Sequence, residues 1–186
     1  MYKNKMILIF TALAIVQLLV PASMIYEKEM VISDGKEFRF RTAPIDPSDP
    51  FRGKYIVLDF RENRVRIDTT KSWDNRNVFA FISTDRKGFA KIDSVTTVKP
   101  EGGNYVKVSR SYRFDDELRV TFPFNRFYME ESKAPIAETA YAEIALDTNQ
   151  VSYAIVSILD GEAVVKDVVI DGVPVKELIE KIQNKK

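Results

Sequence analysis

The stretch FRGKYIVLDF, residues 51–60, predicts the kind of domain that this chain forms. Successive side chains of a strand point to opposite faces, so Leu58 and Phe60 share one face while Val57 and Asp59 share the other. Apolar side chains on alternate positions indicate a half-buried strand. We therefore expect a β-strand that begins at Tyr55, with the core on the Leu58 side.

Short alternating runs of the same type recur along the chain. Hairpin turns are indicated by Gly88, by Asp115 with Asp116, and by Asp160 with Gly161. The last three runs are expected to form a meander. Pro123 indicates a strand end or edge. The expected strands are 37–41, 55–60, 77–83, 89–98, 105–114, 118–124, 141–147, 151–159 and 162–170.

Two short helices are expected among these strands. Ser132 is suited to cap a helix over 132–141, and the spacing of apolar residues after Pro174 predicts an amphipathic helix over 174–182. The fold class is therefore mainly β or α+β, with one antiparallel domain built as a curled sheet or partial barrel.

An uncharged apolar segment, Met6–Tyr26, precedes the β-rich part. As a helix it reaches roughly 30 Å, which matches the hydrocarbon core of a bilayer. Lys3 and Lys5 come before it, so the positive-inside bias places the N-terminus in the cytoplasm. We expect a cytoplasmic segment 1–5, a transmembrane anchor 6–26 and an extracytoplasmic domain 27–186. The alternative is a cleaved signal peptide, because Val20-Pro21-Ala22 resembles a cleavage site.

Composition limits the function classes. The formal net charge is +1, so the chain lacks the basic surface that nucleic-acid binding requires. The many phenylalanines are better explained as core side chains than as a platform on which bases stack. The chain has no histidine and no cysteine, which excludes Ser-His-Asp and Cys-His nucleophiles. We expect no cofactor, no metal and no catalytic residue.

Three blocks of the sequence resemble the GDYXXLXY family, bacterial membrane-anchored proteins of uncharacterised function. They are RTAPIDPSDPFRGKYIVLDF, FISTDRKGFAKIDSVTTVKPEGGNYVKV and FPFNRFYMEESKAPIAE. The resemblance implies a retained anchor in the bacterial cytoplasmic membrane, with the C-terminal domain outside the cytoplasm. It also implies a multispanning membrane protein as partner, because members of the family resemble companions of such proteins. This chain departs from the motif at Lys54, where the family has Asp, and at Phe60, where it has Tyr. A role for the motif acid in metal binding or proton transfer would therefore fail here.

The candidate binding residues lie in two of these blocks: Asp46, Asp49, Arg52, Tyr55, Asn125, Arg126 and Tyr128. Prolines hold the two aspartates apart in the loop Ala43–Pro50, where they can meet arginines to form a rigid polar patch. The alternative account is that the aspartates organise a turn, and that the arginines brace the loop against the Asn125 segment. Calcium binding by Asp46, Asp49, Glu130 and Glu131 is disfavoured because their spacing does not match a calcium loop.

We expect an interaction module that is not an enzyme, held to the bilayer by residues 6–26. Three alternatives remain at this point: a purely structural tether, a sensor of a small ligand, and a hydrolase resembling signal peptidases. The hydrolase would need a Ser-Lys pair, for which Ser33 and Lys107 are the candidates.

Overall fold

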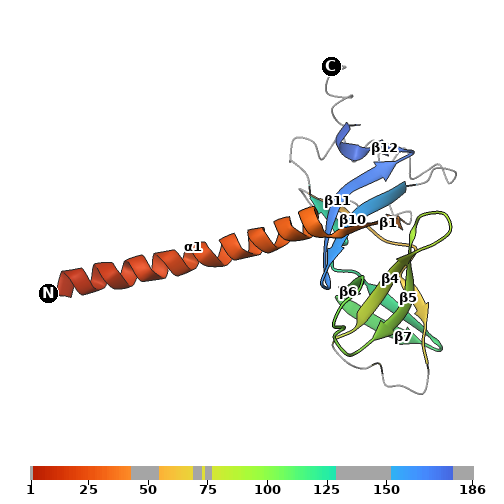
Figure 1. Cartoon of the computed structure of the whole chain (residues 1–186), viewed down its shortest axis with the longest axis horizontal. Coiled ribbons are helices and arrows are strands. Elements are labelled where there is room, and N and C mark those ends of the chain that lie inside the picture. The colour runs from red at the N-terminus through yellow and green to blue at the C-terminus, as the bar shows by residue number, and fades with distance from the viewer. Residues whose placement is uncertain (1, 43–54, 69–72, 74–76, 129–151, 178–186) are drawn as a thin grey trace.

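The chain folds as one long helix followed by antiparallel strands (Figure 1). The structure is a computed structural model that describes residues 2–42, 55–68, 73, 77–128 and 152–177. The elements are α1 (Tyr2–Asp34), β1 (Lys36–Arg41), β2 (Tyr55–Val57), β3 (Arg64–Arg66), β4 (Phe79–Thr84), β5 (Ala90–Thr96), β6 (Tyr105–Lys107), β7 (Arg110–Phe114), β8 (Glu117–Thr121), β9 (Arg126–Tyr128), β10 (Ser152–Leu159), β11 (Glu162–Ile170) and β12 (Val173–Pro174). The predicted fold class is confirmed.

The described strands form four open antiparallel sheets, none closed into a barrel. Their strand orders are β1-β10-β11-β12, β2-β9, β3-β8-β7 and β5-β4-β6. Buried side chains from all four sheets belong to one hydrophobic cluster, so the strands share a core. Phe40, which is fully buried, lies in this cluster together with Leu118 and Val168.

The predicted hairpins are confirmed, because each turn has the backbone conformation that its residues favour. Gly88 between β4 and β5 has a φ of 84°, and Asp115 between β7 and β8 has a φ of 51°. Asp160 and Gly161 between β10 and β11 both have positive φ, as a tight two-residue hairpin requires.

The run 105–114 was predicted as one strand, and this prediction is wrong. Its first half is β6, which pairs with β4, and its second half is β7, which pairs with β8 in a different sheet. The change of partner occurs between two neighbours: the Val108 amide donates to Val78, and the Ser109 amide donates to Thr121. Successive amides of a strand point to opposite edges, so an extended run can pass from one sheet to the next without losing its alternating pattern.

Long-range pairing also decides the neighbours of β10. One edge of β10 pairs with β11 as predicted, but the other pairs with β1, from Lys36 opposite Ile158 to Arg41 opposite Tyr153. The predicted three-stranded meander is therefore wrong, because it required the run 141–147 at the edge that β1 occupies. The predicted strand 141–147 and helix 132–141 lie outside the described residues. The C-terminal helix begins at Val175 and is described as far as Glu177.

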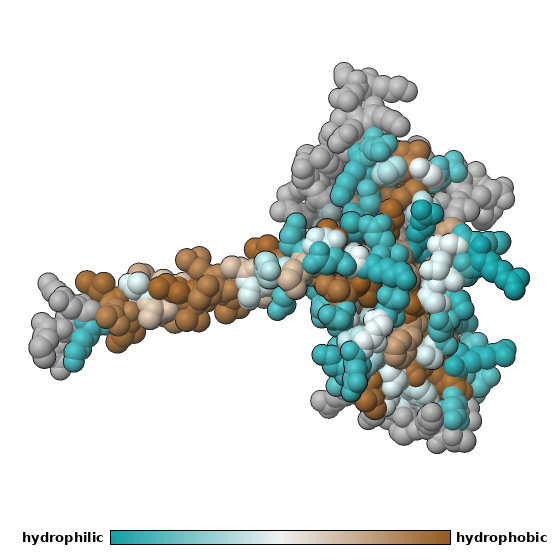
Figure 2. All heavy atoms as spheres, in the orientation of Figure 1, coloured by the Kyte–Doolittle hydropathy of each residue, from teal (hydrophilic) through white to brown (hydrophobic). Residues whose placement is uncertain are grey.

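The N-terminal helix is longer than the predicted anchor and extends well away from the strands (Figure 1). It continues through Pro21 and ends at Asp34, past Tyr26 where the apolar segment stops. Figure 2 shows brown, apolar side chains along most of its length, and these side chains are exposed rather than packed against the domain. The helix is long and apolar enough to cross a membrane.

The last turn of α1 is fastened to the sheet formed by β10 and β11. The final four carbonyls of a helix lack partners within it, and two of them accept side-chain hydrogen bonds here. The Val31 carbonyl also accepts from the Gly35 amide at 3.2 Å. The buried Ser157 hydroxyl donates to the Val31 carbonyl at 2.6 Å, and the Lys166 ammonium donates to the Ile32 carbonyl at 3.3 Å. A Cβ atom at Gly35 would overlap both the Val31 carbonyl and the Ser157 hydroxyl, so only glycine allows this approach.

Replacing Ser157 with Ala should lower the free energy of unfolding of the domain by about 1–2 kcal/mol, because the buried Val31 carbonyl loses a donor. Denaturant unfolding of the full chain in detergent measures this loss. Ser33→Ala is the control, since its hydroxyl bonds the Met30 carbonyl at an exposed site. Equal losses for the two variants would contradict this role of Ser157.

Candidate functional site

Two blocks that stand far apart in the sequence lie side by side as β2 and β9. Tyr55 is opposite Tyr128, Ile56 is opposite Phe127 and Val57 is opposite Arg126. The pairing continues past the strand, because the Leu58 amide donates to the Asn125 carbonyl at 2.8 Å. The motif stretch and the Asn125–Tyr128 block, both singled out from the sequence, therefore form one two-stranded unit.

The structure places part of the candidate site. Asn125, Arg126 and Tyr128 are described in full, and the backbone of Tyr55 pairs with Tyr128. The two aspartates and the arginine of the proline-rich loop, Asp46, Asp49 and Arg52, lie outside the described residues. Arg126 and Tyr128 are exposed, while Phe127 between them is buried in the core.

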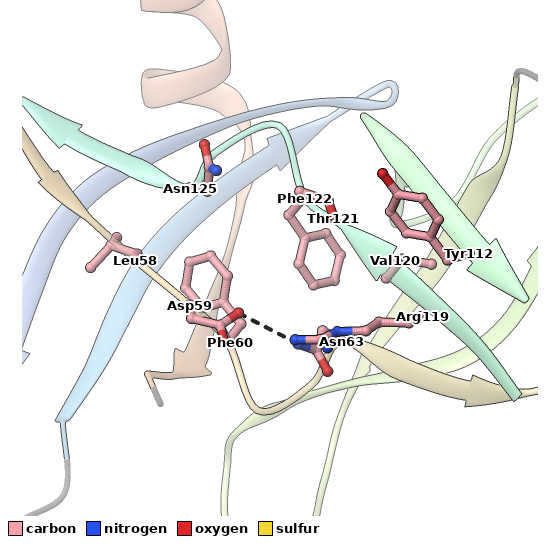
Figure 3. A pocket seen from close by; sticks show the side chains of 10 residues that line it. All are labelled: Leu58, Asp59, Phe60, Asn63, Tyr112, Arg119, Val120, Thr121, Phe122 and Asn125. Carbon is pink, nitrogen blue, oxygen red and sulfur yellow. Dashed lines mark hydrogen bonds between the residues drawn. The ribbon is translucent and has the colours of Figure 1, made fainter. Parts of the chain in front are cut away.

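A cleft of about 220 Å³ lies along the motif strand (Figure 3). We call it the motif cleft, and its lining residues are Leu58, Asp59, Phe60, Asn63, Tyr112, Arg119, Val120, Thr121, Phe122 and Asn125. The Asp59 carboxylate accepts hydrogen bonds from the Phe60 amide at 3.0 Å and from the Asn63 side chain at 3.4 Å. The cleft thus combines an apolar floor with acid, amide, hydroxyl and guanidinium groups, a combination that suits a small polar ligand.

Four phenylalanine rings hold the motif strand in place beside this cleft. Phe40 contacts Phe60, Phe122 and Phe124, with ring centroids 5.1–5.6 Å apart in edge-to-face arrangements. Such ring pairs add about 0.5–1.5 kcal/mol each beyond the burial of their area. Phe60, where the family motif has Tyr, is 3% exposed. Its apolar ring therefore serves the core in this chain.

A second and larger hollow, of about 620 Å³, lies between the end of α1 and strands β9 and β11. We call it the helix-side groove, and its lining residues are Lys28, Ile32, Pro123, Phe124, Arg126, Phe127, Tyr128, Ala163, Val164, Val165, Lys166 and Lys176. Asn125 therefore contributes to the motif cleft, while Arg126 and Tyr128 contribute to this groove. Next to the groove, burial raises the pKa of Asp167, against the opposing effects of the Val168 amide and Lys176.

An ion-pair cluster lies directly after the motif. Arg41 donates to the Glu62 carboxylate at 2.6 Å and to Asp85 at 3.0 Å, and its guanidinium lies over the Phe89 ring. Burial raises the pKa of Glu62, although Arg41 opposes this shift. Hydrogen bonds from the Phe89 and Lys87 amides, assisted by Arg41, lower the pKa of Asp85. The cluster joins β1, the segment after the motif and the β4–β5 hairpin.

The described residues bear on two hypotheses from the sequence, metal binding and a Ser-Lys pair. Within them no group of three or more acidic, histidine or cysteine side chains is arranged to hold a metal ion. Ser33 and Lys107, the pair considered for a hydrolase, are both described, and no hydrogen bond joins them. The Ser33 hydroxyl donates to the Met30 carbonyl of its own helix, while Lys107 projects from β6.

Several residues of these sites were not identified from the sequence. Asn63 and Arg119 line the motif cleft, and Lys166 and Lys176 line the helix-side groove. Arg119 and Lys166 stand in predicted strands and Lys176 in a predicted helix, where a charged side chain is typical of an ordinary solvated surface. The sequence signal was weak for β3 and β9 as well, since three-residue strands are too short to show a period.

Arg41→Ala should destabilise the domain by about 2–3 kcal/mol at neutral pH, because it leaves the Glu62 carboxylate buried without its partner. A carboxyl group whose folded pKa is raised contributes stability below its unfolded pKa and loses it as the pH rises through the folded value. The variant should therefore regain stability as the pH falls toward 4.5, the ordinary pKa of Glu62. Thermal unfolding across this pH range is the measurement, with the exposed Arg86→Ala as control. The same pH slope in Arg41→Ala and wild type would contradict the prediction.

Comparison with known proteins identifies the family of this chain. The model of the GDYXXLXY protein family matches residues 17–168, which include the last part of the apolar segment, β2, β9 and most of the β10–β11 hairpin. No significant match to the chain was found among curated proteins or among solved structures. Because the family match covers most of the chain, this protein belongs to the GDYXXLXY family.

Proposed function

We propose that the protein is a membrane-anchored interaction module whose domain lies outside the cytoplasm and binds a multispanning membrane protein. The observation that supports this proposal most directly is the pairing of β2 with β9, which joins the motif stretch to the Asn125–Tyr128 block. The proline-rich loop directly precedes this unit in the sequence, because Pro50 stands five residues before the start of β2. In this proposal the partner contacts the loop together with Arg126.

The attachment of α1 supports the same function. Ser157 and Lys166 hold the carbonyls at the end of the helix, and Lys28 of the helix pairs with Glu162 at 2.6 Å. A domain fastened to its anchor in this way keeps a constant height and orientation above the bilayer. A partner that is itself embedded in the membrane would then meet the same surface every time.

The proposed orientation follows from charge at the ends of the apolar segment. Lys3 and Lys5 precede it, and cytoplasmic flanks of membrane helices carry such an excess of lysine and arginine. The bacterial cytoplasmic membrane is the location that the family resemblance implies. A retained anchor, rather than a cleaved signal peptide, fits a helix that continues unbroken to Asp34 and docks onto the sheet.

Sensing of a small ligand is the second candidate, and the motif cleft favours it. Its volume of about 220 Å³ suits a molecule of a few non-hydrogen atoms, and Asp59, Arg119 and Asn125 offer charged and amide contacts. A ligand in this cleft would contact Asn125, which directly precedes β9. Sensing of a ligand is therefore compatible with binding of a partner at β9.

Asp49→Ala and Arg126→Ala should each lower the recovery of the partner about fivefold to tenfold, as expected for contact residues at the centre of an interface. The measurement is affinity purification of the full chain in gentle detergent, followed by quantitative mass spectrometry. Arg86→Ala is the matched control, because it removes an exposed arginine from the β4–β5 hairpin. Unchanged partner recovery with both folded variants would refute the proposed contact surface.

Exchanging residues 6–26 for an unrelated apolar helix of equal length tests which part of the chain the partner recognises. If the domain surface carries recognition, the same partner should be recovered at wild-type levels. A partner that packs against the anchor itself would be lost, since packing between membrane helices depends on their particular side chains. Loss of the partner in the exchanged chain would therefore contradict recognition by the domain.

A further inference from the structure

The helix-side groove begins close to the end of the apolar segment. Lys28 and Ile32, which line the groove from α1, follow Tyr26 by two and six residues. At ~1.5 Å per residue these positions lie about 3 Å and about 9 Å beyond Tyr26 along the helix axis. The headgroup layer adds about 5–8 Å on each side of the hydrocarbon core. In a chain whose apolar segment spans a bilayer, the groove therefore starts at the level of the lipid headgroups.

Among the described residues, the groove is lined by four basic side chains and by no carboxylate. Lys28 comes from α1, Arg126 from β9, Lys166 from β11, and Lys176 from the turn of helix after β12. These residues are distant in the sequence, so the concentration of positive charge exists only in the folded chain.

Acidic residues near the groove reduce this charge without removing it. Lys28 pairs with Glu162 and Lys166 pairs with Glu37, and both glutamates are more than half exposed. Exposed ion pairs contribute little to stability and are readily shared with another anion. Glu27 and Glu29 neighbour Lys28 in the sequence, but at about 100° per residue they point to other sides of the helix. Among the described residues that line the groove, positively charged side chains therefore outnumber negatively charged ones.

The uncharged residues of the groove also suit the level of the lipid headgroups. Ile32, Phe127 and the strand residues Ala163–Val165 provide an apolar wall. Tyr128 on the groove and Tyr26 on the helix are both more than 60% exposed. Tyrosine favours the boundary between hydrocarbon and water, because its ring is apolar and its hydroxyl is polar.

We propose that the helix-side groove binds the headgroup phosphate of anionic phospholipid from the bilayer that α1 spans. The inference rests on the membrane attachment in the proposed function. The three lysines of the groove contact the phosphate, and the apolar wall lies against the glycerol and the upper part of the acyl chains. The contacts of Ser157 and Lys166 with the end of α1 hold the groove at headgroup level. Lipid therefore orients the domain on the membrane surface.

The test uses the full chain in nanodiscs of phosphatidylcholine with a rising fraction of phosphatidylglycerol. Native mass spectrometry of the released chain counts the lipids that it retains. The test variant is Lys28→Gln with Lys176→Gln, two exposed lysines of the groove. The control is Lys87→Gln with Lys91→Gln on the β4–β5 hairpin, where Lys91 pairs with Asp93 at 2.7 Å much as Lys28 pairs with Glu162.

Wild type and control should retain phosphatidylglycerol in preference to phosphatidylcholine. A lysine near an anionic membrane surface changes affinity by about fivefold, so the double variant should bind phosphatidylglycerol about tenfold or more weakly. Lys176→Gln alone should show about a fivefold loss. This single variant keeps the Lys28–Glu162 pair and so leaves the helix attachment intact. Equal retention of phosphatidylglycerol by the double variant and wild type, or no lipid preference in wild type, overturns the proposal.

Two further arms distinguish a lipid headgroup from a soluble anion and from an acidic protein. Glycerol phosphate is added to nanodiscs of phosphatidylcholine alone, and thermal protection of the domain by this soluble anion would overturn the assignment to lipid. If the released chain retains an acidic protein and no lipid, the groove binds a protein partner and the lipid proposal is overturned.

The location of the chain separates failure of this proposal from failure of the proposed function. Recovery of the chain outside the nanodiscs would refute the membrane attachment, and the lipid proposal with it. Insertion of the chain without lipid preference would refute the lipid proposal alone.

Discussion

The end of α1 is the constraint on which the position of everything else depends. The last turn of a helix has carbonyls without helical partners, and in this chain these must be satisfied where the domain begins. In this chain the sheet of β10 and β11 satisfies them through Ser157 and Lys166, and Gly35 leaves the space for that approach. Helix α1 and the domain are therefore joined by specific hydrogen bonds as well as by the covalent chain.

The pairing of β2 with β9 has a similar role inside the domain. The rings of Phe40, Phe60, Phe122 and Phe124 pack around it, so burying the motif strand and ordering the Asn125–Tyr128 block are parts of the same packing. The unit has different surroundings on its two sides. The motif cleft is small and polar above an apolar floor, whereas the helix-side groove is larger, basic and next to the anchor.

The sequence predictions succeeded where the interacting residues are close in the sequence and failed where they are distant. Hairpins were predicted correctly because a turn such as Asp160-Gly161 and its two flanking strands are neighbours in the sequence. The run 105–114 was misassigned because its alternating pattern is the same whether one sheet or two receive it. The neighbour of β10 on its other edge was missed because the partner strand, β1, is distant in the sequence, with Lys36 opposite Ile158.

By itself, the sequence determined the local properties of this protein: an apolar helix long enough for a bilayer, antiparallel hairpins and an apolar side to the motif strand. These depend on the solvation of side chains and on backbone preferences that act over a few residues. Only the tertiary structure decided which distant side chains meet. The four bases of the helix-side groove and the buried pair of Arg41 with Glu62 come from separate parts of the chain. Their contacts exist because strand pairing and burial of a shared core bring those parts together. No local sequence pattern predicts such long-range contacts.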